Sequence, residues 1–149
     1  YTTPQRLKNK LGFYAYVLAV IRDLSKLPSE HLRIRINGQT VEGEYIFGIV
    51  ASSSPLAGAM DFFGQKVVAD DGLFEVLLLR RPTSPAELQS TIAALSSQEL
   101  NNELITFCRT DKIELECMKK TNWALDSEKC VGELHHEVEM LPRRIRIVY

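Results

Sequence analysis

The sequence predicts a mainly β domain of the α+β class, an antiparallel β-sandwich or open barrel with two helices. Strand-like segments outnumber helical ones, and most connections between them are of hairpin length. An Asn-Gly dipeptide at 37–38 separates two runs in which apolar and polar residues alternate, which is typical of a β-hairpin. The 149 residues, 45% of them hydrophobic, are enough for one domain with its own core, and no linker divides them.

Two segments have helical patterns. From Pro4 to Leu27, apolar residues recur at steps of three and four, which predicts an amphipathic helix that ends before Pro28. Later, Ser84-Pro85-Ala86-Glu87 places Ser at an N-cap, Pro at the first helical position and Glu three residues after the Ser. This capping box predicts a second helix that continues to about Leu95.

The first two strands are predicted on either side of the 37–38 turn, over 32–36 and from Gln39 towards Ser52. Residues 55–72 lack periodicity, so we expect an irregular loop there with a short strand at Lys66 to Val68. The later strands are expected at Phe74 to Leu79, Leu104 to Arg109, Lys112 to Met118, Asn122 to Leu125, His135 to Met140 and Arg144 to Val148.

The charge balance and the spacing of the cysteines argue against a nucleic-acid-binding protein and against a zinc site. The 18 Lys and Arg residues are balanced by 19 Asp and Glu. Because the chain lacks the excess of basic residues typical of a nucleic-acid binder, no nucleic-acid partner is expected. Cys108, Cys117 and Cys130 have no zinc-site spacing and are expected to be reduced thiols in a cytoplasmic protein. The longest apolar stretch, 11–21, is too short to span a bilayer, so any membrane contact should be peripheral.

Two acidic turns are candidates for chemistry. Asp126 and Glu128 flank one small residue at a strand end, and in an extended segment they would point to the same side. Such a pair can hold a divalent cation or divide into a base and a metal ligand, although ordinary solvated turn acids have the same spacing. The segment Asp70-Asp71-Gly72 is equally compatible with a plain turn and with an oxygen site for Mg²⁺ or Ca²⁺.

Other polar clusters carry weaker hypotheses. His135 and His136 would fall on opposite faces of a strand, so we expect them and the neighbouring Glu133, Glu137 and Glu139 to be solvated rather than metal ligands. Two basic stretches could contact anionic lipid headgroups or could be plain solvated faces: Arg6, Lys8 and Lys10, and Arg143, Arg144 and Arg146. The chain has no GxGxxG, GxxxxGK[ST], HExxH or GxSxG motif, so part of any active site must come from outside it.

A set of segments taken in order is more specific than any one of them. They are Leu11-Gly12-Phe13-Tyr14-Ala15-Tyr16, Val41-Glu42-Gly43-Glu44-Tyr45, Ala57-Gly58, Asp70-Asp71-Gly72-Leu73-Phe74, Leu125-Asp126-Ser127-Glu128, Gly132-Glu133-Leu134 and Leu141-Pro142-Arg143-Arg144-Ile145. Their order and spacing resemble the C-terminal half of bacterial soluble diacylglycerol kinases, a lipid-kinase family with sphingosine kinase relatives. The resemblance covers essentially all 149 residues.

The resemblance implies a domain organisation and a partner. In that family an N-terminal α/β domain with a GGDGT motif binds ATP, and a C-terminal β-sandwich domain closes a cleft over it. No GGDGT occurs here, and the chain starts at Tyr1, a few residues before a helical pattern. We therefore expect residues 1–149 to be the second domain of a phosphotransferase whose ATP-binding domain lies outside this chain, and to be inactive alone.

The resemblance also implies roles for the two acidic turns. The family's L-D-G-E motif places the general base at Asp126, with Glu128 assisting, and the acceptor would be a lipid alcohol such as diacylglycerol. Its D-D-G-x-F turn implies a structural Mg²⁺ held by Asp71 and by the backbone carbonyls of Val68 and Leu73. The location implied is cytoplasmic and peripheral at the membrane, and whether the intact protein forms a homodimer is left open.

The chain departs from the family pattern at two places. Ser127 replaces the Gly of D-G-E, and Ser52-Ser53-Ser54 with Ala57-Gly58 stands where the family shows N-x-x-x-G-G. Two alternative functions therefore stay open. One is a non-catalytic lipid-binding or interaction module on the same fold, and the other is phosphorylation of a nicotinamide dinucleotide, since NAD kinases share the two-domain plan.

Overall fold

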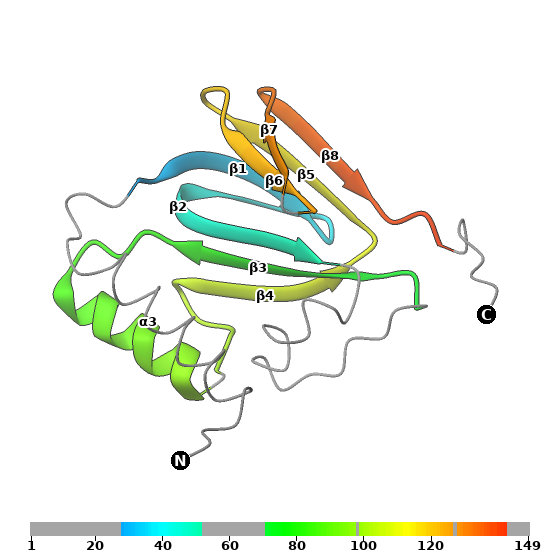
Figure 1. Ribbon diagram of the computed structural model, residues 1–149. Coiled ribbons are helices and arrows are strands. Elements are labelled where there is room, and N and C mark those ends of the chain that lie inside the picture. The colour runs from blue at the N-terminus through cyan, green and yellow to red at the C-terminus, as the bar shows by residue number, and fades with distance from the viewer. Residues whose placement is uncertain (1–27, 52–70, 98, 127, 143–149) are drawn as a thin grey trace, which may run out of the picture.

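A six-stranded antiparallel sheet is the centre of the structure (Figure 1). The structure is a computed structural model that describes residues 28–51, 71–97, 99–126 and 128–142. The strand order of the sheet is β4-β3-β2-β1-β5-β8, and β6 and β7 form a separate hairpin. The elements are β1 (Glu30–Ile36), β2 (Gln39–Ala51), β3 (Phe74–Arg80), α3 (Pro85–Ser97), β4 (Ile105–Thr110), β5 (Lys112–Cys117), β6 (Asn122–Leu125), β7 (Glu128–Val131) and β8 (His135–Glu139).

The mainly β, antiparallel architecture predicted from the sequence is confirmed, and the predicted strands lie close to their observed bounds. Within the described residues there is one helix, α3. Three predicted elements lie outside the described residues, as does most of the loop expected over 55–72: the helix from Pro4 to Leu27, the short strand from Lys66 to Val68 and the strand from Arg144 to Val148.

The β1–β2 connection has the predicted hairpin geometry. Asn37 and Gly38 have φ angles of 49° and 76°, and Ile36 pairs with Gln39 directly beside them. Positive φ at both central positions is what a type I′ turn requires, and Asn-Gly is the dipeptide that adopts it at the lowest steric cost. This turn fixes the register of two strands that together lie in the middle of the sheet.

Helix α3 begins at the predicted cap. The Ser84 Oγ accepts a hydrogen bond from the Glu87 backbone N–H at 3.2 Å, which confirms Ser84 as the N-cap. The reciprocal half of the capping box is shifted by one residue. The Glu87 carboxylate accepts from the backbone N–H and the hydroxyl of Thr83, at 2.6 and 2.9 Å, and these donors lower the pKa of Glu87.

The core lies on both faces of the sheet because β3 alternates its apolar side chains between them. Leu77 and Leu79 contact α3, which covers this face in Figure 1, whereas Val76 and Leu78 point to the opposite face. The buried cluster on the α3 face contains Ala51, Leu77, Leu79, Ala94, Leu95, Leu100, Ile105 and Phe107. The cluster on the opposite face contains Ile34, Ile36, Tyr45, Phe74, Val76, Leu78, Ile113 and Leu115, and Trp123 of β6 packs against it.

The α3 face of the sheet becomes charged beyond β2. On β1, Arg33 and Arg35 alternate with the buried Ile34 and Ile36, so both arginines point away from the core on the opposite face. They form ion pairs with acids on both neighbouring strands: Arg33 with Glu42 and Glu116, and Arg35 with Glu114. Exposed pairs of this kind each add little stability, so their main effect is to keep this half of the face polar.

Candidate functional site

The two carboxylates of the D-x-E segment lie at the turn of the β6–β7 hairpin. Leu125 pairs with Glu128, so residues 126 and 127 form the two-residue connection between the strands. Asp126 has a φ of 47° and both Asp126 and Glu128 are exposed. The chain therefore reverses between the two acids, so they do not lie in one extended segment with both side chains on the same side.

Strand β7 is the element that the sequence pattern did not predict. Its residues, Glu-Lys-Cys-Val, do not alternate apolar with polar side chains, so the segment gives no strand pattern of its own. It pairs with β6 because the Asp-Ser connection has the length of a two-residue hairpin. Asp is among the few residues other than Gly that tolerate the left-handed conformation, which is the local reason that Asp126 can occupy the first turn position.

The other end of the hairpin is fixed by Trp123 and Gly132. The Trp123 ring lies 4.6 Å from the His136 ring, centroid to centroid, and packs against the core cluster on this face. The Gly132 backbone N–H donates to the Thr121 carbonyl at 2.9 Å. A Cβ at Gly132 would overlap both the Thr121 carbonyl oxygen and the Trp123 ring, so only Gly fits at this position. The hairpin is thus held in place at the end near Trp123 and Gly132, and its acidic turn at the other end is exposed.

The second acidic turn places Asp71 directly before β3. The Asp71 Oδ1 accepts a hydrogen bond from the Leu73 backbone N–H at 2.9 Å, and Gly72 between them has a φ of 78°. The Asp71 Oδ2 accepts from the Arg109 guanidinium, which comes from β4. Of the implied metal ligands, Val68 lies outside the described residues, so the structure brings Asp71 and Leu73 together and leaves Val68 undescribed.

Arg109 also approaches Glu75, a residue that the sequence analysis did not identify. Glu75 and Arg109 are paired across β3 and β4, and the Arg109 Nε lies 3.3 Å from the Glu75 Oε1 without the alignment of a hydrogen bond. The Glu75 side chain is 3% exposed, and burial raises the pKa of its carboxyl above the ordinary value. The sequence did contain a sign of it, because Glu75 is the one charged residue inside the apolar run 73–79.

Asp71, Glu75 and Arg109 sit at one edge of the sheet. Asn37, at the β1–β2 turn, donates from its side-chain Nδ2 to the Arg109 carbonyl at 3.2 Å, which ties that turn to the end of β4. Within the described residues no group of three or more His, Cys, Asp or Glu side chains could hold a metal ion. The carboxylate of Asp71 is a hard oxygen ligand suited to Mg²⁺, but here its counter-charge is the Arg109 guanidinium.

The two histidines of the His-rich segment fall on opposite faces of the strand, as predicted, but only His135 is exposed. In the register of β5 and β8, His135 lies opposite Glu116 and His136 opposite Leu115, so the two imidazoles point to opposite faces of the sheet. His135 is exposed, whereas His136 contacts Trp123 and its Nε2 lies 2.8 Å from the Glu133 carbonyl. The two histidines therefore cannot share one metal ion.

Cys108, Cys117 and Cys130 are all free, as predicted. Burial raises the pKa of the Cys108 and Cys117 thiols, so both are held in the unreactive protonated form. In the part of the chain that the structure describes, helical segments lack the length and hydropathy of a membrane span.

Two known proteins are similar to this chain along nearly its whole length. It is 24% identical over 148 residues to a diacylglycerol kinase of Bacillus subtilis (strain 168), an alignment that covers 99% of this chain and 48% of that protein. It is also 24% identical over 147 residues to an uncharacterized protein of Synechocystis, covering 96% of this chain and 34% of that protein. The chain thus spans less than half the length of either relative.

Solved structures support the same fold. A crystal structure of a diacylglycerol kinase from Bacillus anthracis str. Sterne superposes with a TM-score of 0.57 at 21% identity, over 91% of this chain and 45% of that one. A second structure of a protein from the same organism gives a TM-score of 0.62 at 19% identity, over 95% of this chain and 47% of that one.

The family assignment rests on nearly the whole chain. The profile described as the YegS C-terminal NAD kinase beta sandwich-like domain matches residues 2–149. The similarity to diacylglycerol kinases extends along their C-terminal half, as the resemblance of the ordered segments predicted. The chain therefore belongs to the family of the YegS C-terminal NAD kinase beta sandwich-like domain and is a distant homologue of diacylglycerol kinases.

Proposed function

We propose that this chain is the second domain of an ATP-dependent lipid kinase of the diacylglycerol kinase type. The observation that carries the proposal is the match of residues 2–149 to the family profile, joined to 24% identity with a diacylglycerol kinase along 99% of the chain. In this proposal an N-terminal domain outside these 149 residues binds ATP, and the present domain supplies the groups that act on the lipid hydroxyl. In this proposal the domain alone is inactive, because the nucleotide binds to the other domain.

Asp126 is the proposed general base. An alcohol is a weak nucleophile at neutral pH, and a carboxylate at hydrogen-bond distance helps by accepting the hydroxyl proton as the oxygen attacks the γ-phosphorus. The bond between that phosphorus and the leaving oxygen of ADP then breaks. The exposed position of Asp126 at a hairpin turn supports the role because the carboxylate is accessible to a second domain and to a lipid headgroup. Glu128, which directly follows the turn, would orient the Asp126 carboxylate or the hydroxyl.

A structural Mg²⁺ is proposed at the 71–73 turn. Asp71 would contribute its carboxylate, and Val68 and Leu73 would contribute backbone carbonyls, a set of hard oxygen ligands of the kind that Mg²⁺ prefers. When bound, such a cation supplies positive charge that orders an acidic turn. The turn directly precedes β3, a strand that is buried on both faces. Ordering the turn would therefore fix the position at which this interior strand begins.

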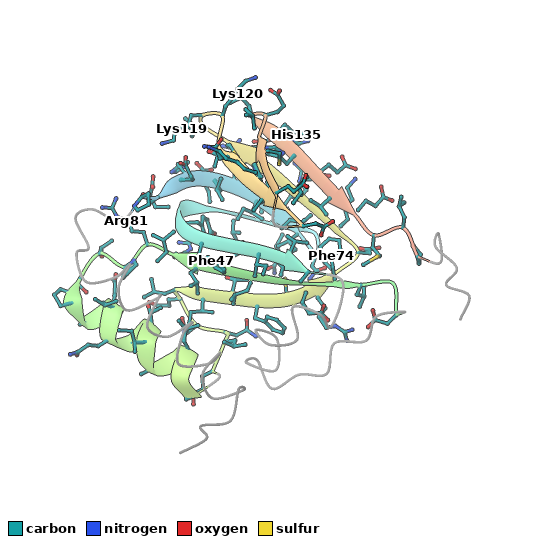
Figure 2. The ribbon with its side chains drawn as sticks, in the orientation of Figure 1. Phe47, Phe74, Arg81, Lys119, Lys120 and His135 are labelled. Atoms are coloured by element: carbon teal, nitrogen blue, oxygen red, sulfur yellow. The ribbon has the colours of Figure 1, made fainter. Side chains whose placement is uncertain are left out.

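A peripheral membrane contact is proposed at the loops that join β5 to β6 and β7 to β8. Met118 and Leu134 in these loops, and Val131 at the end of β7, are exposed at 78%, 51% and 74%. The two loops are in contact, since the Cys117 backbone N–H donates to the Leu134 carbonyl at 2.7 Å. Figure 2 shows Lys119 and Lys120 at the same end of the molecule. Apolar side chains beside lysines are suited to the headgroup region of an anionic bilayer.

The experiment compares full-length proteins that contain this chain. Asp126→Asn should lower kcat for diacylglycerol phosphorylation by a factor on the order of 10² to 10⁴, the usual contribution of a general base. Asn tolerates a positive φ as well as Asp does, so the turn should be retained. The matched control is Asp111→Asn, an exposed turn acid between β4 and β5, which should keep wild-type activity. Full activity in the Asp126 variant would exclude it as the base.

A second candidate substrate is a nicotinamide dinucleotide, because the family description itself refers to the NAD kinase sandwich. The same full-length protein should therefore be assayed with NAD and with diacylglycerol in parallel. Phosphate incorporation into NAD alone would replace the lipid-kinase proposal. Binding to anionic liposomes without ATP turnover on either acceptor would favour the non-catalytic lipid-binding module, which the replacement of Gly by Ser127 motivates.

A further inference from the structure

The Asp71 carboxylate already has a donor on each oxygen. Its Oδ1 accepts from the Leu73 backbone N–H at 2.9 Å, and its Oδ2 accepts from the Arg109 guanidinium. The first bond is local and shapes the turn, whereas the second joins the turn to a different strand, β4. Only the second one brings a positive charge to the place where a cation is proposed.

Glu75 gives the same guanidinium a second carboxylate. Its side chain is 3% exposed, and its Oε2 has no hydrogen-bond partner within the part of the chain that the structure describes. The Arg109 Nε, also buried and without a hydrogen bond there, lies 3.3 Å from the other oxygen, Oε1. One guanidinium thus lies against two carboxylates. The Arg109 Nε and the Glu75 Oε2 are nevertheless left without a hydrogen bond among the described residues. Buried polar atoms without a hydrogen bond, even within an ion pair, are costly.

A guanidinium and a divalent cation repel each other, so each weakens the contact of the other with the same carboxylate oxygen. We infer that the Arg109 guanidinium is the resident counter-charge of Asp71 and competes with the divalent cation for it, so that cation binding transfers Arg109 fully to Glu75. The inference rests on the proposed cation site at Asp71. Glu75 makes the exchange feasible because its Oε1 already lies 3.3 Å from the Arg109 Nε and its Oε2 has no hydrogen-bond partner among the described residues.

The consequence is a coupling between two contacts. A bound cation weakens the Asp71–Arg109 ion pair, and the ion pair weakens cation binding by the same factor, as linkage requires. Arg109 would therefore set the concentration of free Mg²⁺ at which the 71–73 turn acquires its metal. Arg109 is a positioning residue in this account, because it acts through Asp71.

The test measures Mn²⁺ affinity of the full-length protein without nucleotide or lipid, by following free Mn²⁺ with electron paramagnetic resonance. Arg109→Met should bind Mn²⁺ at least about fivefold more tightly than wild type, the lower end of typical coupling between sites. Arg109→Lys, which keeps the charge, should stay closer to wild type. The matched control is Arg35→Met, which removes an arginine paired with Glu114 elsewhere on the sheet and should leave the affinity unchanged.

Two further variants test whether a change in Mn²⁺ affinity comes from misfolding or from the change in net charge alone. Glu75→Gln combined with Arg109→Met removes one negative and one positive charge, leaves no buried carboxylate unpaired, and should still bind Mn²⁺ more tightly than wild type. Unchanged or weaker Mn²⁺ binding in this double variant would overturn the competition. Asp71→Asn should abolish the affected site. If it leaves Mn²⁺ binding intact, the inference and the cation site both fall, whereas the lipid-kinase proposal is decided separately by the Asp126 assay.

Discussion

Glu75 on β3 and Arg109 on β4 face each other in register, and the Arg109 Nε lies 3.3 Å from the Oε1 of a carboxylate that is 3% exposed. The pair lies at the end of the α3-side core, since Glu75 shares its face with Leu77 and Leu79. Burying this charged pair costs desolvation free energy. Removing one partner should therefore have a different effect on stability from removing both.

The first prediction concerns the stability of proteins that lack Arg109 alone or both Arg109 and Glu75. Arg109→Met should destabilise the protein by about 3 kcal/mol, because it leaves the Glu75 carboxylate buried without a counter-charge. Adding Glu75→Gln to the same protein should recover most of that loss. Thermal unfolding of the three full-length proteins measures both steps. If the double variant is as unstable as Arg109→Met, the loss comes from packing of the arginine stem and not from the unpaired charge.

The second prediction concerns His31, which lies between two glutamates on β2. Its Nε2 is 2.9 Å from the Glu42 carboxylate and its Nδ1 is 3.3 Å from that of Glu44. The hydrogen bond to Glu42 raises the pKa of His31 above 6.5. The contribution of this contact to stability is therefore complete below about pH 6.5 and is lost as the pH rises through the higher pKa of the folded state.

Replacing His31 with Gln, which keeps a hydrogen-bonding side chain, should flatten the dependence of Tm on pH above about 6.5. The measurement is a series of thermal unfolding curves between acid and mildly alkaline pH for wild type and His31→Gln. A slope in that range that is the same for both proteins would show that His31 does not titrate with folding.

The sequence predicted elements whose pattern is local. The Asn37-Gly38 turn, the Ser84 cap and the alternating strands each carry their own residue chemistry, so they could be placed without knowing the fold. Strand β7 could not be placed this way, because it becomes a strand only by pairing with β6. The Glu75–Arg109 contact was missed for a related reason, since its partners are brought together by the β3–β4 register across an intervening helix.

The candidate site shows the same division. Asp126 and Asp71 were identified from short motifs, but their conformations were not. Asp126 occupies a left-handed turn position rather than an extended one, and Asp71 is paired with an arginine that lies on another strand. A motif gives the residue types that a reaction needs, whereas the charges around them depend on strand register, which the motif does not contain.

The third prediction concerns the base of the β6–β7 hairpin. Gly132→Ala should destabilise the protein by about 1 to 3 kcal/mol, because the added Cβ overlaps the Thr121 carbonyl and the Trp123 ring. Hydrogen exchange of β6 and β7 should increase in the variant. The matched control is Gly48→Ala in β2, where a Cβ would meet only a flexible Leu78 methyl at 3.3 Å. Equal effects of the two substitutions would contradict a special role for Gly132.

The fourth prediction concerns Ser127, which follows Asp126 in the hairpin connection. Two-residue hairpin connections favour residues that accept a positive φ, and Asp126 in this one has a φ of 47°. Gly accepts that conformation freely, whereas another residue loses about 1 kcal/mol in it. Ser127→Gly, which restores the family's D-G-E, should therefore stabilise the hairpin by about 1 kcal/mol. If Asp126 is the base, the same substitution should raise kcat for lipid phosphorylation, because a better-formed turn holds the carboxylate in position.

The two readouts separate the fold from the chemistry. Thermal unfolding reports the turn, and kcat with diacylglycerol reports the base. A stabilised protein with unchanged kcat would mean that the hairpin geometry does not limit the reaction. A destabilised protein would mean that Ser127 suits this turn better than Gly, and the departure from the family motif would then be an adaptation of this chain rather than a defect in its site. The matched comparison is Ser127→Ala, which lacks both the hydroxyl and the freedom of Gly and should be no more stable than wild type.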